Sequence, residues 1–406
     1  MLLTALSLVL LLASLAQLTL ALRSCRAVPS LDALPPAQTP PSGWPVLSVI
    51  VPAKDEGAHI EAALRSKLGC AYPALQVVVV NDRSTDDTPT ILARMRGEQE
   101  RARREDPSLP ELVVTRVDAL PDGWLGKLHA MHRGLSVATG EWALFADADV
   151  HLAPSTLDRI IAHAERAQID FVAVFPKMEP VNLVIDASLA GLLRALMLAA
   201  RMWKANTDGS GIGAGVGAFN LARRRWLEDT RAIEQLRMEI ADDVALGALL
   251  KQSGARTRLF VGRESVSLVF QDSLSALFRS ADKGGGMFGW VLWRPVVMAL
   301  APTLIELVLP VAAIIHGGVA ATAGALSLAA ITATHVIVSA HCAVPVRGAW
   351  LWPLGHVFNA ATMLRAGWLA WRRQGVVWRS TFYPREVVDA GRRMDLTTMK
   401  VAVREG

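Results

Sequence analysis

The sequence predicts an α/β domain with a mixed, mostly parallel sheet, preceded and followed by transmembrane helices. Three observations lead to this prediction. Short runs rich in β-branched residues alternate with helical patterns between residues 46 and 285, which is typical of parallel α/β sheets. Long apolar stretches lie on either side of this region in the sequence. Hydrophobic residues make up 52% of the 406-residue chain and charged residues only 19%, a balance too apolar for an ordinary soluble enzyme.

The first apolar stretch, residues 1–22, is long enough to cross a bilayer as a helix. Arg23 and Arg26 follow the apolar run, whereas a cleaved signal peptide carries its positive charges before it. We therefore expect a retained membrane anchor, with a cleaved signal peptide as the alternative. Residues 23–45 are rich in proline and are predicted to form a stiff linker.

The predicted sheet domain comprises residues 46–285. Its helical patterns cover residues 58–67 and 88–104, and its strand-like runs lie at 47–52, 77–80, 112–114, 142–145 and 171–175. Ligands of parallel α/β sheets bind beyond the carboxyl ends of the strands. We therefore expect the functional residues directly after these strands.

After residue 285 the chain becomes apolar again. The predicted membrane helices of residues 286–371 are two full candidates and a weaker, more polar one, at 295–316, 319–340 and 350–371. The tail, 372–406, is basic, and the positive-inside rule places such a tail in the cytoplasm. When the sheet domain is also cytoplasmic, this rule requires an even number of spans after it, and two full spans with the third segment lying in the membrane interface fit best. We therefore predict a multi-pass protein of the inner (cytoplasmic) membrane, with the sheet domain facing the cytoplasm.

Charge and cysteine content exclude other classes of protein. The formal net charge is +5 without a focused basic patch that carries aromatic residues, so we expect no nucleic-acid partner. Cys25, Cys70 and Cys342 are scattered and form no CxxC pair. We therefore expect neither a zinc site nor a disulfide framework.

Asp82 follows the second strand-like run. A carboxylate in this place can accept the N–H of a pyrimidine base, and we interpret Asp82 as a ligand-binding residue. The next polar residues, Ser84, Thr85 and Asp86, are better explained as a cap for the helix that follows. The acids that end the first strand-like run are a weaker signal, because many strands end in an acidic loop.

Asp147-Ala148-Asp149 directly follows an apolar strand. Hard divalent cations take oxygen ligands and often share them with phosphate oxygens. A metal ion held here can bridge a diphosphate and stabilise it as a leaving group. The alternative is an acidic loop before the helix that begins near Pro154.

Asp242 and Asp243 open an amphipathic helix. One of them is a candidate general base for an acceptor hydroxyl, and the alternative is favourable acid at a helix N-terminus. Residues 209–217 are rich in glycine but lack the strand–turn–helix setting of a dinucleotide-binding loop. We predict that they form a flexible loop that lines a pocket.

The order of these motifs resembles that in family 2 glycosyltransferases. Over about residues 46–285 the family's motifs match LSVIVPAKDE, VNDRSTDDT, the GK-x-x-A-x-x-x-G pattern from Gly126 to Gly134, DAD and ADD. The flanking apolar segments and the run Gly123-Trp124-Leu125-Gly126-Lys127 are similar to the hopene-associated glycosyltransferases and, more distantly, to the ceramide glucosyltransferases. The resemblance implies a GT-A fold, a UDP-sugar donor and Mg²⁺ or Mn²⁺.

The resemblance also implies a role for each matching residue. In the donor site, Asp82 contacts the base, and Pro52, Asp55 and Glu56 lie near it. Lys127 lies along the donor, and Asp147 contacts the nucleotide or the sugar. Asp149 ligates the metal, and Asp243, beside Asp242, is the catalytic base.

The chain departs from the family in two places. The first acid of its Glu-Asp-like pair is Asp242, which is one methylene shorter, and the QxxRW motif is absent. Arg279 is a candidate diphosphate contact in the region that replaces this motif, with a surface arginine as the alternative.

Together these features predict inverting transfer of a sugar from a UDP-sugar to a lipid acceptor, such as a hopanoid or another isoprenoid or sphingoid lipid. The missing QxxRW motif and the few spans argue against a polysaccharide synthase. A nucleotidyltransferase on a related sheet needs a glycine-rich basic loop after its first strand, where this chain has the acidic residues 53–56. A non-enzymatic membrane scaffold has no need for acids at these strand and helix ends.

Overall fold

The structure is a computed structural model that describes residues 1–379, 381–395 and 398–402. The chain forms two compact units, each assembled from segments that are separate in the sequence. The first unit comprises Met1–Ala27, Met178–Lys204 and Val269–Ala390. The second comprises Val28–Lys177, Ala205–Leu268 and the described residues 391–395 and 398–402.

The second unit is built on an eight-stranded sheet of order β3-β2-β1-β4-β7-β6-β8-β5. Its strands are β1 Leu47–Ala53, β2 Leu75–Asp82, β3 Glu111–Val117, β4 Trp142–Phe145, β5 His151–Leu152, β6 Phe171–Met178, β7 Asn220–Arg223 and β8 Thr257–Leu268. Strands β1 to β4 pair in parallel. Strand β7 runs antiparallel to both β4 and β6, and β5 runs antiparallel to β8. The sheet is therefore mixed, as predicted, with the direction of β1 shared by β2, β3, β4 and β6.

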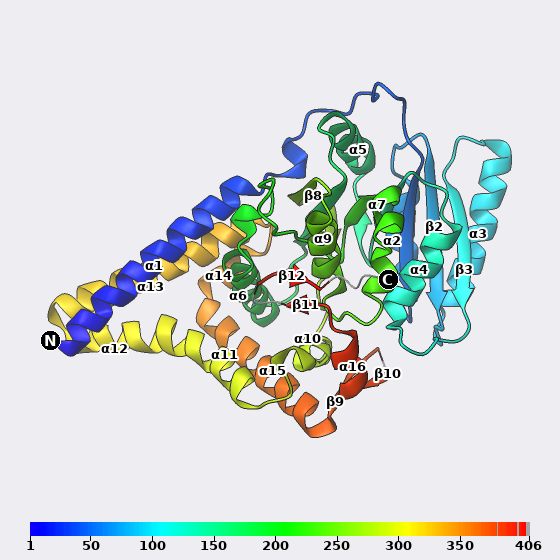
Figure 1. Cartoon of the computed structure of the whole chain (residues 1–406). Coiled ribbons are helices and arrows are strands. Elements are labelled where there is room, and N and C mark those ends of the chain that lie inside the picture. The colour runs from blue at the N-terminus through cyan, green and yellow to red at the C-terminus, as the bar shows by residue number, and fades with distance from the viewer. Residues whose placement is uncertain (380, 396–397, 403–406) are drawn as a thin grey trace. The chain divides into compact units, whose positions relative to one another are not determined.

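Helices cover this sheet. They are η1 Leu31–Ala33, α2 Ile60–Leu68, α3 Thr88–Glu105, α4 Gly126–Val137, α5 Thr156–Arg166, α7 Arg224–Asp229, α8 Ala232–Gln235 and α9 Asp242–Gln252. Figure 1 shows α3 and α4 beside the parallel strands β2 and β3. Every residue of β1 is buried, which is the expected result for a continuous apolar run in a sheet covered on both faces.

The C-terminal segment also belongs to the second unit. Its two short strands, β11 Met394–Asp395 and β12 Lys400–Val401, pair antiparallel. The buried carboxylate of Glu239 accepts hydrogen bonds from the backbone N–H groups of Arg393 at 2.7 Å and Met394 at 2.9 Å. Gln252 Oε1 accepts another from Val401 N at 3.2 Å. These bonds attach the segment to the loop before α9 and to the end of α9.

The first unit is mainly helical. Its elements are α1 Leu2–Ala27, α6 Leu183–Ala199, η2 Met202–Lys204, α10 Leu274–Asp282, η3 Lys283–Phe288, α11 Trp293–Thr303, η4 Leu304–Val308, α12 Leu309–His316, α13 Gly318–His341, α14 Val346–Trp350, α15 Trp352–Arg373, β9 Gly375–Trp378, β10 Thr381–Pro384 and α16 Arg385–Gly391. Helices α1 and α13 lie side by side (Figure 1). Among the described residues, three helices are long and apolar enough to cross a membrane: Leu2–Ala27, Trp293–His316 and Gly318–His341.

A buried polar cluster lies among the helices of the first unit. Glu306 is on a π-helical turn, η4, in the middle of the candidate span Trp293–His316. Both of its carboxylate oxygens accept hydrogen bonds from Arg194 of α6, each at 2.9 Å. Arg194 also donates to Gln17 of α1, and His356 Nε2 of α15 lies 3.6 Å from Glu306. A π-turn that places an ionisable residue inside an apolar helix is uncommon.

The compact units divide the chain differently from the predicted domains. Residues 178–204 and 269–285, inside the predicted sheet domain of 46–285, belong to the first unit. Residues 28–45, in the predicted linker, and the described residues 391–395 and 398–402 of the predicted basic tail belong to the second. The weaker predicted span at 350–371 corresponds to α15, which is not among the three apolar helices.

Candidate active site

A pocket in the second unit lies where β1 and β4 end. It comprises about 210 Å³ of space, open solvent included, and its lining residues are Pro52, Lys127, Met131, Phe145, Ala146, Asp147, Gly217, Asn220 and Asp242. Four of the predicted site residues line it: Pro52, Lys127, Asp147 and Asp242.

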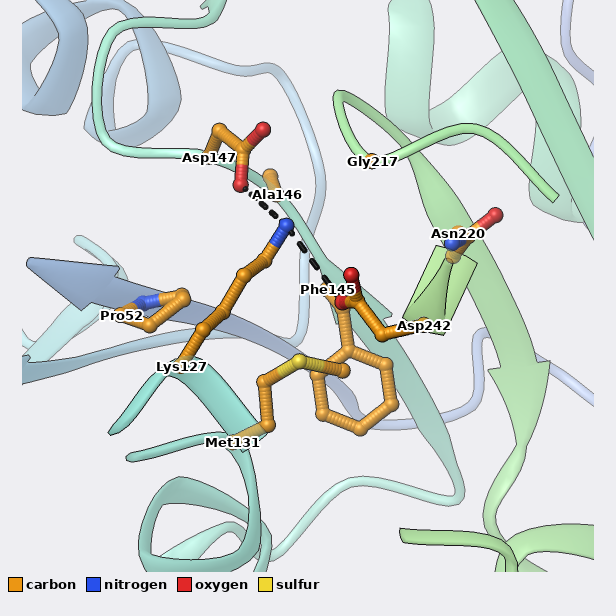
Figure 2. A pocket seen from close by; sticks show the side chains of 9 residues that line it. All are labelled: Pro52, Lys127, Met131, Phe145, Ala146, Asp147, Gly217, Asn220 and Asp242. Atoms are coloured by element: carbon orange, nitrogen blue, oxygen red, sulfur yellow. Dashed lines mark ion pairs between the residues drawn. The ribbon is translucent and has the colours of Figure 1, made fainter. Parts of the chain in front are cut away.

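Lys127 occupies the centre of the pocket (Figure 2). Its Nζ lies 2.9 Å from Asp147 Oδ1 and 3.6 Å from Asp242 Oδ2. Burial by itself lowers the pKa of Lys127, but the carboxylates of Asp147, Asp242 and Asp243 outweigh burial and raise that pKa above its ordinary value. Lys127 therefore carries a firmly held positive charge.

Asp243 is joined to the pocket through Gly217. Gly217 N donates to Asp243 Oδ2 at 2.9 Å, and Val244 N donates to Asp243 Oδ1 at 2.8 Å. A Cβ atom at Gly217 would lie 3.3 Å from both Asp147 Oδ2 and Asp243 Oδ2, and 3.4 Å from Lys127 Nζ. Gly217 thus lies where the three charged side chains converge. The prediction that the glycine-rich loop lines a pocket is confirmed for this residue.

Two other glycines allow the same loop to pack closely against α9. A Cβ atom at Gly215 would lie 1.8 Å from the carbonyl oxygen of Asp243, and one at Gly247 would lie 2.4 Å from the carbonyl carbon of Ala214. Only glycine fits such backbone approaches. The glycine spacing therefore determines the distance between the loop and Asp243.

Asp82 is buried at the end of β2, close to the start of α4. Arg83 binds it with two hydrogen bonds, Nε to Oδ1 at 2.7 Å and Nη2 to Oδ2 at 3.1 Å. A Cβ atom at Gly126 would lie 2.6 Å from Asp82 Oδ2. Asp82 therefore lies beside the residue that precedes Lys127, and each of its oxygens accepts one hydrogen bond from Arg83.

The loop after β1 is tied to the loop after β2. Asp55, with a φ of 54°, accepts from Thr85 N at 2.7 Å, and its own N–H donates to Ser84 Oγ at 3.0 Å. Asp86 accepts from Thr88 N at 3.0 Å and from Gly57 N at 2.9 Å. The capping interpretation therefore holds for Asp86, whereas Ser84 and Thr85 bind the neighbouring loop.

Asp149 and Arg279 lie outside the lining of this pocket. Asp149 is half-buried and interacts electrostatically with Lys67, a wholly buried residue of α2. Arg279 is exposed on α10, in the first unit. Among the residues that the structure describes, no group of three or more His, Cys, Asp or Glu side chains is arranged to hold a metal ion.

Sequence reasoning missed Lys67, Arg83 and Asn220. Lys67 follows Arg65 in a polar stretch of α2 and looks like a surface residue. Arg83 was read only as part of a motif, although its φ of 57° marks a tight turn. Asn220, whose Oδ1 accepts from Val216 N at 2.8 Å, reaches the pocket because β7 pairs with β4. That long-range pairing leaves no local signal in the sequence.

The chain is similar to known glycosyltransferases. Residues 48–230 match the model of the family Glycosyl transferase family 2. A beta-monoglucosyldiacylglycerol synthase of Nostoc sp. is 30% identical over 132 residues, which are 32% of this chain and 26% of that protein. A 4,4'-diaponeurosporenoate glycosyltransferase of Staphylococcus aureus is 35% identical over 104 residues, 26% of this chain and 24% of that protein. The matches thus span about a quarter of each relative.

Among solved structures, a mannosyltransferase from Pyrobaculum calidifontis in complex with GDP-Man and Mn²⁺ covers 92% of this chain and 98% of its own, with 20% identity and a TM-score of 0.47. The family match covers β1 to β7 and the acids at the ends of β2 and β4. It confirms the predicted GT-A class of the mixed sheet. The chain therefore carries a glycosyltransferase family 2 domain.

Proposed function

We propose that this protein is a membrane-bound, inverting glycosyltransferase that moves a sugar from a UDP-sugar to a lipid acceptor. One observation carries the proposal. Lys127 is held between Asp147 and Asp242, and Asp243 reaches the same place through Gly217. A cation for a diphosphate and a carboxylate for a hydroxyl proton are thus within one site.

The donor diphosphate binds near Lys127 in this proposal. Lys127 is in the first turn of α4, and the N-terminal end of a helix favours anions. Asp82, at the same end of α4, accepts the N–H of the uracil base. Asp147 contacts the nucleotide or the sugar, with Pro52 beside it in the pocket wall. Asp55 and Glu56 act nearby by shaping the loop after β1.

Asp149 is proposed to bind Mg²⁺ or Mn²⁺. These ions are commonly held by one or two carboxylates together with phosphate oxygens, so the donor chemistry of this acidic turn fits them. The ion, when bound, supplies positive charge against the leaving diphosphate. Lys127 supplies charge to the same group from α4.

Asp243 is the proposed catalytic base. It takes the proton of the acceptor hydroxyl, whose oxygen attacks the anomeric carbon opposite the diphosphate and inverts its configuration. The N–H groups of Gly217 and Val244 orient the carboxylate and leave further lone pairs for the proton. Asp242, 3.6 Å from Lys127 Nζ, helps to hold that ammonium group in place.

Two observations support a lipid acceptor and a membrane location. Three helices of the first unit have the length and composition of membrane spans. The names of two relatives refer to a diacylglycerol lipid and to diaponeurosporenoate. The proposed location is the inner membrane, with the catalytic unit on the cytoplasmic side, where nucleotide sugars are made.

The test is transfer of labelled sugar by the purified full chain from a panel of UDP- and GDP-sugars to extracted lipids. The variant Asp243→Asn should lower transfer by about 10²–10⁴-fold, the range expected for loss of a general base, with donor binding retained. Asp118→Asn, an exposed surface change, is the matched control. Wild-type transfer by Asp243→Asn would refute the base, and exclusive use of GDP-sugars would refute the UDP donor.

A further inference from the structure

Lys67 is a wholly buried lysine that the proposed mechanism does not use. Its exposed fraction is 0%, and it lies near the C-terminal end of α2. Lysine is almost never fully buried without a partner, because transfer of an ammonium group out of water is costly. An apolar residue of similar size avoids this cost, so the buried charge requires an explanation.

The Lys67 ammonium group binds the backbone just after the Asp147-Ala148-Asp149 turn. It donates hydrogen bonds to the carbonyl oxygen of Val150 and, at 3.4 Å, to that of Ala63 in its own helix. Val150 N donates at 3.3 Å to the carbonyl oxygen of Asp147. The turn is therefore closed on one side by its own backbone and held on the other by Lys67.

The rest of the helix end reinforces this attachment. Leu152 N donates to Ser66 Oγ at 3.1 Å, Cys70 Sγ lies 3.7 Å from the carbonyl oxygen of Ala153, and Ala71 N donates to that of Pro154 at 2.9 Å. The end of α2 thus binds segment 150–154 along its length. Lys67 contributes the bond nearest to the two acids.

The charge of Lys67 also acts on these acids. Burial lowers the pKa of Lys67 to about 8, and the attraction of Asp149 and, less strongly, of Asp147 opposes this effect. The group is therefore mostly charged at neutral pH. Removal of the charge alone would make the turn more negative and strengthen its attraction for a cation, whereas loss of the Val150 contact would let the turn move and weaken that attraction.

We propose that Lys67 is a positioning residue that holds Asp149 in the orientation needed to bind the divalent cation of the donor complex. The inference rests on the proposed function, because it assumes that this turn binds a cation. Lys67 acts through Val150 and the backbone of the turn and does not touch the substrate. Its geometric effect on Asp149 outweighs its electrostatic repulsion of the cation.

The test compares Lys67→Met with the wild-type full chain. Each protein is titrated with Mn²⁺ in the presence of UDP, and electron paramagnetic resonance measures the Mn²⁺ that is bound. Methionine keeps the length of the side chain and removes charge and donor. We expect about tenfold weaker Mn²⁺ binding, since residues that support metal ligands contribute about 10–100-fold to affinity. The melting temperature should change little, because removal of a buried ammonium group offsets the loss of a donor to the Val150 carbonyl.

Two further measurements separate positioning from folding. Hydrogen exchange of the backbone at 147–152 should be faster in Lys67→Met, and Ser66→Ala, which keeps the ammonium group, should change Mn²⁺ affinity by less than about twofold. Unchanged or tighter Mn²⁺ binding by Lys67→Met overturns the inference, as does weaker binding together with a strongly lowered melting temperature, which would show a role in folding. A wild-type chain that binds neither Mn²⁺ nor UDP contradicts the proposed function and the inference together.

Discussion

Each unit of this protein buries a cation beside acids, but the balance of charge differs. In the first unit Arg194 binds both oxygens of one carboxylate, Glu306, at 2.9 Å, so a positive group meets one negative group. In the second unit Lys127 interacts with three carboxylates, those of Asp147, Asp242 and Asp243. A matched pair suits a structural contact between helices, whereas one ammonium group among several acids suits a site that exchanges ligands.

The geometry of the two clusters agrees with this distinction. Guanidinium and carboxylate groups form a rigid planar pair, and the Arg194–Glu306 pair joins α6 to the π-turn. Lys127 lies at unequal distances from its partners, 2.9 Å and 3.6 Å. Charge balance and bond geometry thus distinguish the Arg194–Glu306 pair from the cluster around Lys127, which belongs to the proposed active site.

The largest expected effect is on stability, in the first unit. Arg194→Met leaves the Glu306 carboxylate buried without its guanidinium partner, and breaking a buried pair in this way costs about 3–5 kcal/mol. We expect a strongly lowered melting temperature of the detergent-solubilised protein. The double variant Arg194→Met with Glu306→Met should recover most of this loss. If the single variant melts like the wild type, the pair is not a structural contact.

The next effect is on catalysis, in the second unit. Lys127→Met should lower kcat/KM by about 10²–10³-fold, as does removal of one charged or polar group that stabilises a transition state, while the melting temperature falls by less than in Arg194→Met. Steady-state kinetics with the best UDP-sugar of the panel measures it. Equal losses of stability and activity would show that Lys127, like Arg194, is mainly structural.

A smaller effect is expected beside Asp82. Gly126→Ala introduces a Cβ atom 2.6 Å from Asp82 Oδ2 and 2.8 Å from Arg83 Nη2, so the two side chains must shift. We expect about a tenfold higher KM for the donor, equivalent to about 1.4 kcal/mol. Gly97→Ala in α3, where a Cβ atom has no neighbour within 4 Å, is the control. An unchanged KM in Gly126→Ala removes Asp82 from the donor site.

The smallest effect concerns pH. The pKa of Lys127 is raised in the folded protein, so its contribution to stability is fully present below the unfolded pKa of about 10.4 and is lost only as pH rises through the higher folded pKa. The difference in melting temperature between wild type and Lys127→Met should therefore stay constant from about pH 6 to 9. A difference that disappears by pH 9 would contradict the raised pKa.

Much of the fold could be predicted because its signals are local. The predicted strands at 47–52 and 142–145 differ from β1 and β4 by at most one residue, since continuous apolar runs are buried in a parallel sheet. Strand β8 was missed because the exposed charged residues Arg263 and Glu264 interrupt its buried residues. The assignment of α6 to the first unit depends on long-range packing, which one segment's pattern does not contain.

The candidate site was predictable where acids follow strands or open a helix. Asp82 ends β2, Asp147 lies two residues after β4, and Asp242 begins α9, so their positions follow from the order of the elements. The position of Lys127 between Asp147 and Asp242 could not be predicted, because it depends on the angle at which α4 packs. The burial of Lys67 depends on the course of segment 150–154, which no periodicity in α2 encodes.

The attachment of the C-terminal segment has a consequence for protein engineering. Glu239 accepts hydrogen bonds from Arg393 N and Met394 N, and its other oxygen accepts from Ala241 N at 3.2 Å, one residue before Asp242. Truncation before Gly391 would therefore leave a buried carboxylate without two donors and loosen the start of α9. A shortened protein without its final strands would be an unsuitable reagent for kinetics, even if it were easier to purify.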